Sequence, residues 1–282
     1  MPPSPGAPEK DFHRAGWNRS GFGALRSAWL ATRGLLTRVL GPARVDRILW
    51  NLGFFSAKSR WFRFETVTAD GHRVSLRPED QAVLDEVHTD RVYADGRIGE
   101  DGTVVDCGAH IGLFTLYAAR RCPRGRVVSV EPSPLNLEVL RRNVARNGLA
   151  NVSVVPWALS GTAGPGCIHF TGEYATDYIL APVIGKASSF TLPVERHTLD
   201  ELFAREKVAH CQLLKMDIEG SELEVLKASG KALERTEQVL LELHKRVISV
   251  AEMRALLEAQ GFRCKLFRET ADAAHLYGDK GP

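Results

Sequence analysis

The 282-residue sequence lacks the features that would indicate a membrane span or a disulfide-bonded fold. It has no apolar run of about eighteen residues, the length that a membrane-spanning helix needs. Its N-terminus has neither the apolar core nor the cleavage site of a secretory signal. The five cysteines are scattered, odd in number and never in Cys-x-x-Cys spacing, which argues against a disulfide framework and a cysteine zinc site. We therefore expect a cytoplasmic protein with reduced thiols.

The sequence also lacks the overall basic charge of many nucleic-acid-binding proteins. The net charge is +3, but residues 1–50 hold eight Lys or Arg and three acids, a surplus of +5. The remaining residues hold 29 bases and 31 acids, so this larger part is slightly acidic. We therefore expect no nucleic-acid partner.

Residues 1–60 are predicted to form a basic helical arm outside the main domain. The pattern over 21–40 is helical, and Gly41-Pro42 ends it. One side of this helix carries Leu25, Trp29, Leu36 and Leu40. We expect this apolar side to pack on the main domain or on a partner subunit of a homo-oligomer. Peripheral contact with a membrane surface stays an alternative.

Residues 61–282 are predicted to fold as one α/β domain. Residues 61–77 indicate a β-hairpin around Asp70-Gly71, and a helix is expected from Pro78-Glu79 to about Thr89. Strands then alternate with helices, which predicts a doubly wound, mostly parallel seven-stranded sheet. The expected strands are 103–107, 127–131, 152–156, 212–217, 238–243, 262–267 and 273–277, and the expected helices are 112–121, 135–147, 198–205, 221–229 and 251–260. An insertion at about 160–197, with extra strands of its own, interrupts this alternation.

The stretch Val-Val-Asp-Cys-Gly-Ala-His-Ile-Gly at 104–112 is typical of a loop that binds part of a nucleotide. A strand leads into it, a helix follows, and Gly108 and Gly112 let a ligand approach the backbone closely. Glu131 ends the next strand, where such folds place an acid that binds the ribose hydroxyls. A dinucleotide and an adenosyl compound fit these features equally.

Asp106 distinguishes between these two cofactors. It stands where a dinucleotide fold places its first glycine, and a carboxylate beside a pyrophosphate costs Coulomb energy. Beside the ammonium and sulfonium groups of S-adenosylmethionine the same charge is favourable. The sequence therefore favours S-adenosylmethionine over NAD. Asp106 could at the same time satisfy loop amides or the start of the next helix.

The segment Lys-Met-Asp-Ile-Glu-Gly at 215–220 predicts the reacting edge of the domain. Asp217 follows a buried strand, at the carboxyl edge where open α/β sheets bind their ligands. His244 ends the next expected strand and should face the same edge. Lys215 needs a charged partner inside the sheet, and the candidates are Asp217, Glu242 and Glu131. We assign Ser221 and Glu224, which have capping-box spacing, to the start of the next helix.

Together these segments resemble the FkbM-type S-adenosylmethionine-dependent methyltransferases. The matching pieces are VVDCGAHIGLFTLYAAR, VVSVEPSPLNLEVLRRNVARNG, WALSG, HTLDEL and, most specifically, KMDIEGSELEVL, all within about residues 78–270. The resemblance implies a Rossmann-like class I methyltransferase fold and O-methylation of a hydroxyl on a sugar, glycolipid or natural product. By the same resemblance, the methionine part is held by Asp106, Gly108 and Gly112 and the ribose by Glu131, while Ala158 and Ser160 lie near the adenine and Asp217 and Glu219 on the acceptor side.

His110 departs from the family pattern, whose loop usually has Gly-Ala-Asn. Asparagine is common there because it tolerates unusual backbone angles, and histidine shares part of that tolerance. We interpret His110 as a loop residue beside the cofactor and not as a catalytic base.

Methyl transfer to a hydroxyl needs a base near the acceptor, and the candidates are Asp217 and His244, with Glu219 beside them. Asp217, Glu219 and Glu242 could instead hold a divalent metal, but their spacing does not by itself predict one. The expected acceptor is a small molecule or a glycan. Two other classes stay open: an NAD-dependent oxidoreductase, and a non-catalytic adaptor that keeps the fold and docks through its basic arm.

Overall fold

The computed structural model describes residues 32, 35–41, 44–45, 48–49, 63–77, 80–89, 92–93, 95–170, 178–179 and 190–281. The chain divides into two compact units, Met1–Val45 and Asp46–Pro282. In the first unit, residues 35–40 are helical, and Leu36 and Leu40 are exposed. Leu25 and Trp29, which we predicted on the same helix side, lie outside the described residues.

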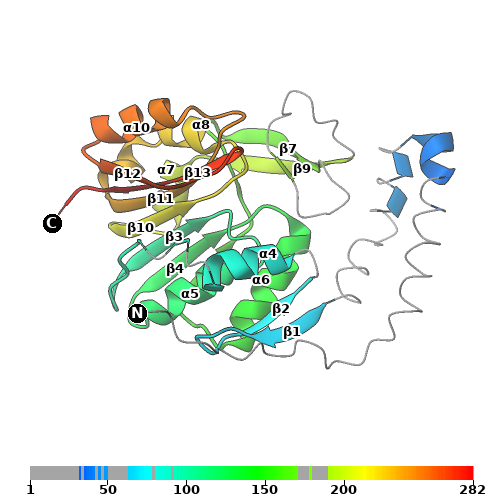
Figure 1. Cartoon of the computed structure of the whole chain (residues 1–282), viewed down its shortest axis with the longest axis horizontal. Coiled ribbons are helices and arrows are strands. Elements are labelled where there is room, and N and C mark those ends of the chain that lie inside the picture. Colours follow the sequence, from blue (N-terminus) through cyan, green and yellow to red (C-terminus); the bar gives the residue numbers. More distant parts are fainter. Residues whose placement is uncertain are drawn as a thin grey trace, which may run out of the picture. The chain divides into compact units, whose positions relative to one another are not determined.

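A seven-stranded sheet forms the centre of the second unit (Figure 1). Its strands are β3 (Thr103–Cys107), β4 (Arg126–Val130), β5 (Val152–Val155), β10 (Cys211–Met216), β11 (Thr236–His244), β12 (Arg263–Glu269) and β13 (Ala273–Asp279). Their order is β12-β13-β11-β10-β3-β4-β5. The five strands from β11 to β5 are parallel, whereas β13 runs antiparallel to β11 and β12 antiparallel to β13. The predicted mostly parallel sheet is confirmed.

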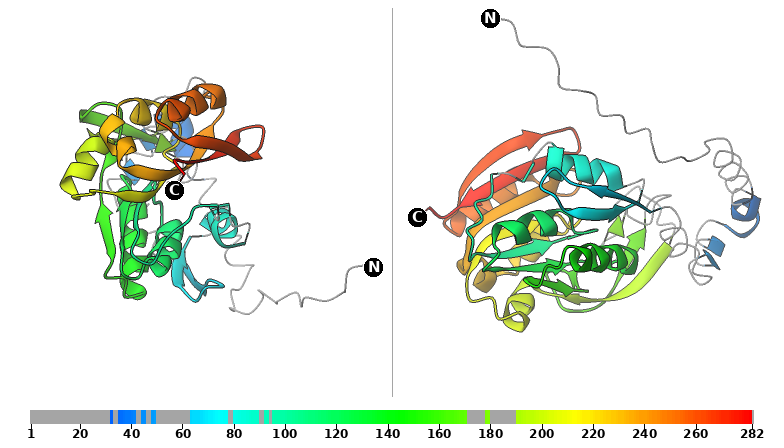
Figure 2. Two further views of the ribbon diagram at one scale, coloured as in Figure 1. Left: turned by 90° about the vertical axis from the view of Figure 1, so that its left-hand side faces the viewer. Right: turned by 90° about the horizontal axis from the view of Figure 1, so that it is seen from below.

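Helices cover both faces of this sheet, as expected for a doubly wound fold (Figure 2). One face carries α5 (Leu113–Arg121), α6 (Pro134–Arg146) and the hairpin of β1 (Phe64–Val67) and β2 (Arg73–Leu76), and the other carries α7 (Leu199–Arg205), α8 (Glu222–Lys227), α9 (Gly230–Glu234) and α10 (Val250–Ala259). Neighbouring residues of the central strands bury their side chains on opposite faces, as Leu213 and Leu214 do. This explains why these strands are continuous apolar runs in the sequence.

The predicted insertion forms a second sheet. Its strands are β6 (Ala158–Leu159), β7 (Gly164–Phe170), β8 (Tyr178–Ile179) and β9 (Phe190–His197), in the order β6-β9-β7-β8. The predicted extra strands are thereby confirmed. Gly71, with a φ of 86°, supplies the left-handed residue of the predicted β1-β2 turn.

Two predicted helices differ from the structure. Within the expected helix that ends near Thr89, a short α-helix, α4 (Gln81–Leu84), continues into a π-helical turn, η2 (Asp85–Thr89), and residues 78–79 lie outside the described part. The helix expected over 221–229 is shorter, and α9 follows it as a separate helix. The hydroxyl of Ser229 donates to the carbonyl of Val225 at 2.5 Å, and such a bond competes with the continuing backbone ladder.

All five cysteines are free thiols, and Cys107, Cys122 and Cys211 are buried. Among the described residues, none of the helices has both the length and the apolarity to cross a membrane.

Candidate active site

The two motif segments meet at the carboxyl edge of β3 and β10. These strands are parallel neighbours, and the chain leaves them in opposite directions, so a crevice for ligands is expected between their ends. The amide of Asp217 donates to the carbonyl of Cys107 at 3.0 Å, which ties the second motif to the first. The structure thus brings together two segments that lie about a hundred residues apart in the sequence.

The glycines of the loop make room for protein atoms. A Cβ on Gly108 would lie 1.7 Å from the carbonyl oxygen of Asp217, and one on Gly112 would lie 2.4 Å from Cδ1 of Leu140. Both glycines also have positive φ values, 78° and 90°. We predicted that these glycines leave space for the ligand. In the structure, the space where their side chains would lie is filled by Asp217 and Leu140. The first task of these glycines is to let the loop pack against the β10 edge and α6.

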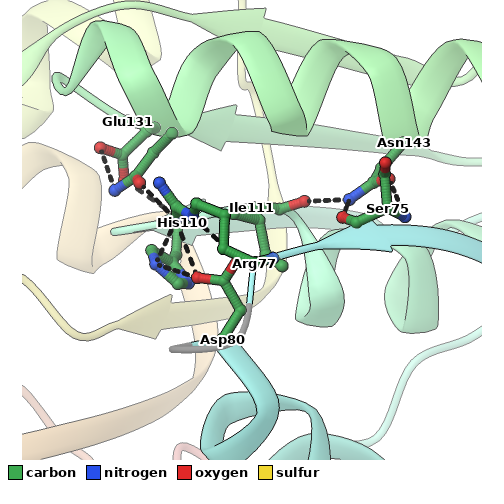
Figure 3. Close-up of polar contacts among 8 residues, drawn as sticks. Ser75, Arg77, Asp80, His110, Ile111, Glu131 and Asn143 are labelled. Atoms are coloured by element: carbon green, nitrogen blue, oxygen red, sulfur yellow. Dashed lines mark hydrogen bonds and ion pairs between the residues drawn. The ribbon is translucent and has the colours of Figure 1, made fainter. Parts of the chain in front are cut away.

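His110 adopts a left-handed backbone conformation, with a φ of 52°. Its Nε2 lies 3.2 Å from Nη2 of Arg77 and 3.4 Å from Oδ1 of Asp80 (Figure 3). Because a guanidinium only donates, Nε2 is the accepting nitrogen of the ring. Burial lowers the pKa of His110 to about 4, so the imidazole is neutral at physiological pH. Such a weakly basic ring, turned toward the β2 side, is suited to holding the loop in place.

The side chains that hold the loop at 108–112 belong to residues that the sequence analysis did not predict. Arg77 and Asp80, both buried, form a two-pronged ion pair at 2.9 and 2.8 Å, and Arg77 also donates to Oδ1 of Asn136 at 2.9 Å. The side chain of Asn143 in α6 accepts from the amide of Ser75 and donates to the carbonyl of Ile111, at 2.7 and 2.9 Å (Figure 3). The β1-β2 hairpin is therefore bound to the loop through α6.

Glu131 lies directly after β4 and is 1% exposed. Its Oε2 accepts from the amide of His110 at 2.9 Å, and its Oε1 accepts from the amide of Ser133 at 2.8 Å and from the side chain of Asn136 at 3.3 Å. The acid that we predicted as the ribose ligand therefore also orders the loop. A carboxylate has about four acceptor positions, and these three bonds fix its orientation at the edge of the sheet.

Asp106 is fully buried and pairs with Lys215 of the neighbouring strand. Its Oδ2 accepts from the hydroxyl of Thr115 at 2.6 Å, and its Oδ1 lies 3.4 Å from Nζ of Lys215. Lys215 donates to the carbonyl of Gly108 at 2.9 Å and lies 4.0 Å from Oδ2 of Asp217. Burial disfavours its ammonium, yet the carboxylates of Asp106 and Asp217 raise the pKa of Lys215 above its ordinary value.

This pairing changes two of our predictions. We expected the partner of Lys215 among three acids that did not include Asp106, and the nearest carboxylate is that of Asp106. We also expected Asp106 to face a cation of the cofactor, and the nearest cation in the structure is the lysine of the chain itself. The bond from α5 to Asp106 comes from the hydroxyl of Thr115 and not from a backbone amide, so it does not provide the expected cap at the start of this helix.

The three predicted catalytic residues lie together. Donor atoms of Asp217, Glu219 and His244 are within 4.8 Å of one another, and Nε2 of His244 is 3.2 Å from Oε2 of Glu219. These atoms are close enough to share a divalent cation, in which case one nitrogen and two carboxylate oxygens would bind it. Glu242, which we had considered for a metal site with Asp217 and Glu219, lies in a different cluster, with Glu86 and His275.

The pKa shifts in this cluster distinguish Asp217 from His244 as the candidate proton acceptor. Burial, together with the carboxylate of Glu242, raises the pKa of Asp217 well above its ordinary value. Burial disfavours the imidazolium of His244, but the carboxylates of Glu219 and Glu222, 3.2 and 3.6 Å from its ring nitrogens, raise its pKa to about 11. His244 is therefore protonated at neutral pH, which disfavours it as the proton acceptor. Asp217 is the better candidate.

Ala158, in β6, and Ser160, just after it, were both predicted near the adenine, and both are buried. The hydroxyl of Ser160 donates to Oε1 of Glu224 at 2.7 Å. The predicted capping box is therefore wrong, since Ser221 makes no side-chain cap and Glu224 binds the β6 segment instead. The amides of Ile218 and Gly220 donate to Oε1 of Glu222, the first residue of α8.

Comparison with known proteins identifies the family. A sequence model of the methyltransferase FkbM domain matches residues 106–264, which include the segment 215–220 and residues 106–112 of the first motif segment. The chain belongs to the FkbM methyltransferase family. Methyltransferase sdnD of Sordaria araneosa is 29% identical over 213 residues, which cover 65% of this chain and 82% of that protein. The 31-O-demethyl-FK506 methyltransferase FkbM of Streptomyces tacrolimicus is 30% identical over 218 residues, which again cover 65% of this chain and 82% of that protein.

Among solved structures, the methyltransferase FkbM from Methylobacillus flagellatus KT matches with a TM-score of 0.48 and 19% identity, over 84% of this chain and 62% of that chain. Membership of the FkbM methyltransferase family agrees with the fold described above and makes this chain a methyltransferase. It also confirms the cofactor that we predicted, because FkbM-type methyltransferases use S-adenosylmethionine.

Proposed function

We propose that this protein is an O-methyltransferase that transfers the methyl group of S-adenosylmethionine to a hydroxyl of a sugar, a glycolipid or another natural product. The observation that carries the proposal is the position of Asp217, whose backbone is bound to the cofactor loop and whose carboxylate has a raised pKa. The name of the Streptomyces tacrolimicus relative, a 31-O-demethyl-FK506 methyltransferase, supports an oxygen acceptor.

The residues at the edge of the sheet fit an adenosyl cofactor. Oδ1 of Asp106 is a buried oxygen that lies 3.4 Å from the ammonium of Lys215 and accepts no hydrogen bond among the described residues, so it could still accept one from the ammonium of the methionine part. Glu131 would bind the ribose, and His110 would shape the loop beside the methionine part. The loop that Gly108 and Gly112 allow would pass beside the methionine part, and Ala158 and Ser160 would lie on the adenine side. The cofactor supplies an activated methyl group.

The side chains near Asp217 position the acceptor and remove its proton. A hydroxyl is a poor nucleophile, so Asp217 would take its proton, and S-adenosylmethionine would supply the methyl group that the oxygen receives. Lys215, whose Nζ lies 4.0 Å from Oδ2 of Asp217, opposes the rise in the pKa of Asp217 from inside the sheet. The imidazolium of His244, paired with Glu219, offers a hydrogen-bond donor to the acceptor.

Binding and truncation experiments test this proposal against the other two classes. Calorimetry of the full chain should show saturable binding of S-adenosylmethionine and no comparable binding of NAD; the reverse result would support an oxidoreductase. A chain without residues 1–55 should keep cofactor binding and turnover. An adaptor would give two other results: the intact chain would have no turnover, and the truncated chain would no longer bind its partner.

The acceptor and the location of the reaction belong to the same proposal. We propose a small-molecule or glycan acceptor and a cytoplasmic enzyme. The basic arm would contact a partner subunit or a membrane surface. Incubating a cell extract with isotope-labelled S-adenosylmethionine and following the label by mass spectrometry would identify the acceptor.

A further inference from the structure

A second cluster of ionisable side chains lies on β11 and β13, next to the cluster that contains Asp217. Glu242 in β11 and His275 in β13 are direct partners in the antiparallel register, and Glu86 approaches them from the π-helical turn η2. The side chain of His275 is 4% exposed, that of Glu242 16% and that of Glu86 28%. The histidine is thus almost fully enclosed, and the two acids beside it are partly buried.

The distances in this cluster are long for hydrogen bonds. Nε2 of His275 is 3.3 Å from Oε2 of Glu242 and 3.5 Å from Oε1 of Glu86, whereas a charge-assisted N–H···O bond is about 2.7–2.9 Å long. Among the described residues, neither ring nitrogen of His275 has a hydrogen-bond partner. The imidazole is therefore aimed at two carboxylates without a well-made bond to either of them.

The same distances suit a metal ion. Zinc binds histidine nitrogen and carboxylate oxygen at about 2.0–2.2 Å, so neighbouring ligand atoms of a tetrahedral site lie about 3.3–3.6 Å apart. All three donor atoms lie within 4.8 Å of one another. Burial disfavours the imidazolium of His275, but the carboxylates of Glu242 and Glu86 raise its pKa to about 9, so a divalent cation would displace the ring proton. The neutral imidazole and two carboxylates would then balance the charge of the cation, and nitrogen and oxygen ligands together suit zinc or manganese.

The surroundings hold the imidazole in place without polar bonds. The ring centroid of His275 lies 6.4 Å from that of Tyr93 and 5.7 Å from that of Phe267. This packing fixes the ring plane while leaving Nε2 directed at the carboxylates. A preoriented ligand loses little side-chain entropy when it binds a cation.

We propose that Glu86, Glu242 and His275 form a binding site for one divalent metal ion of the zinc or manganese type, with a water molecule completing the coordination. The ion links the η2 turn to β11 and β13. The site shares no ligand with the neighbouring cluster of Asp217, Glu219 and His244, and it does not depend on the proposed methyl-transfer function.

Metal titration of the full chain tests this site. Protein freed of metal by a chelator is titrated with Zn²⁺ by competition calorimetry and with Mn²⁺ by electron paramagnetic resonance. We expect one tight equivalent, and we expect His275→Gln and Glu86→Gln each to weaken its binding at least about tenfold. Two substitutions serve as controls and should leave this binding unchanged. His210→Gln removes the histidine of an exposed His–Glu pair with a 3.1 Å contact, and Glu219→Gln alters the other cluster.

Thermal unfolding with and without metal gives a second readout. Metal that binds the native state should raise the melting temperature of the wild type and of His210→Gln, but not that of Glu86→Gln. Glu86 is the most exposed ligand, so this variant stays informative if His275→Gln fails to fold. The proposal is overturned if no equivalent binds, if His275→Gln and Glu86→Gln bind as the wild type does, or if Glu219→Gln alone removes binding.

Discussion

The carbonyl oxygen of Asp217 occupies the place where a side chain on Gly108 would begin. The two residues belong to the two motifs of the chain, and their contact sets the distance between the cofactor loop and the candidate base. Because Gly108 also has a positive φ, no other residue type satisfies both the backbone conformation and the contact.

Gly108→Ala should therefore destabilise the protein far more than an alanine at another left-handed glycine. Gly148 is the matched control, since it has a φ of 61° and no atom within 4 Å of an added Cβ. We expect Gly148→Ala to cost about 1 kcal/mol of unfolding free energy, and Gly108→Ala at least about 2 kcal/mol more. Denaturant unfolding measures both, and equal losses would show that the contact with Asp217 is unimportant.

The buried pair of Lys215 and Asp106 should be costly to break. Lys215→Met leaves the carboxylate of Asp106 without its cation, a change that typically costs about 3–5 kcal/mol. Lys265→Met removes the cation of an exposed pair with Asp95 and should cost less than about 1 kcal/mol. Similar unfolding free energies for the two variants would contradict the assigned pairing.

His110 should make the stability of the protein depend on pH. The pKa of His110 is lowered to about 4 in the folded chain, from an ordinary value of 6.5, so between these values the unfolded chain takes up a proton that the folded chain does not. Stability from this residue is complete above about pH 6.5 and is lost as the pH falls toward 4.

Comparing His110→Asn with the wild type isolates this effect. Between pH 7 and pH 4.5 the wild type should lose about 2 kcal/mol more unfolding free energy than the variant. Asparagine accepts the same left-handed backbone and has no proton to gain in this range. Parallel pH curves for the two proteins would show that the imidazole is not held neutral.

The sequence predicted the sheet and the position of the site because both depend on local patterns. Apolar runs such as 103–107 define buried strands, and residues that follow parallel strands must meet at one edge. That is why Asp217, Glu219 and His244 could be placed together before the structure was known.

The partners of those residues could not be predicted in the same way. The packing of the hairpin on α6 brings Ser75 to Asn143 and Arg77 to Asn136. Sequence periodicity does not indicate which distant residue a polar side chain will bind. The capping-box prediction failed for the same reason, because Glu224 finds its partners, Ser160 and Gly161, across the fold. Tertiary contacts decide whether such a side chain binds its local helix end or a distant residue.

The central claim is that the methyl group of S-adenosylmethionine is transferred at the edge where Asp217 lies. Asp217→Asn keeps the shape of the side chain and removes its ability to take a proton, whereas Asp272→Asn makes the same change in an exposed ion pair with Arg246. The most direct measurement compares both variants with the wild type in calorimetry with S-adenosylmethionine and in transfer of its labelled methyl group to extract metabolites. The account predicts wild-type cofactor affinity in all three proteins and a loss of at least about a hundredfold in transfer for Asp217→Asn alone. Unchanged transfer in Asp217→Asn, or no binding of S-adenosylmethionine to the wild type, would contradict it.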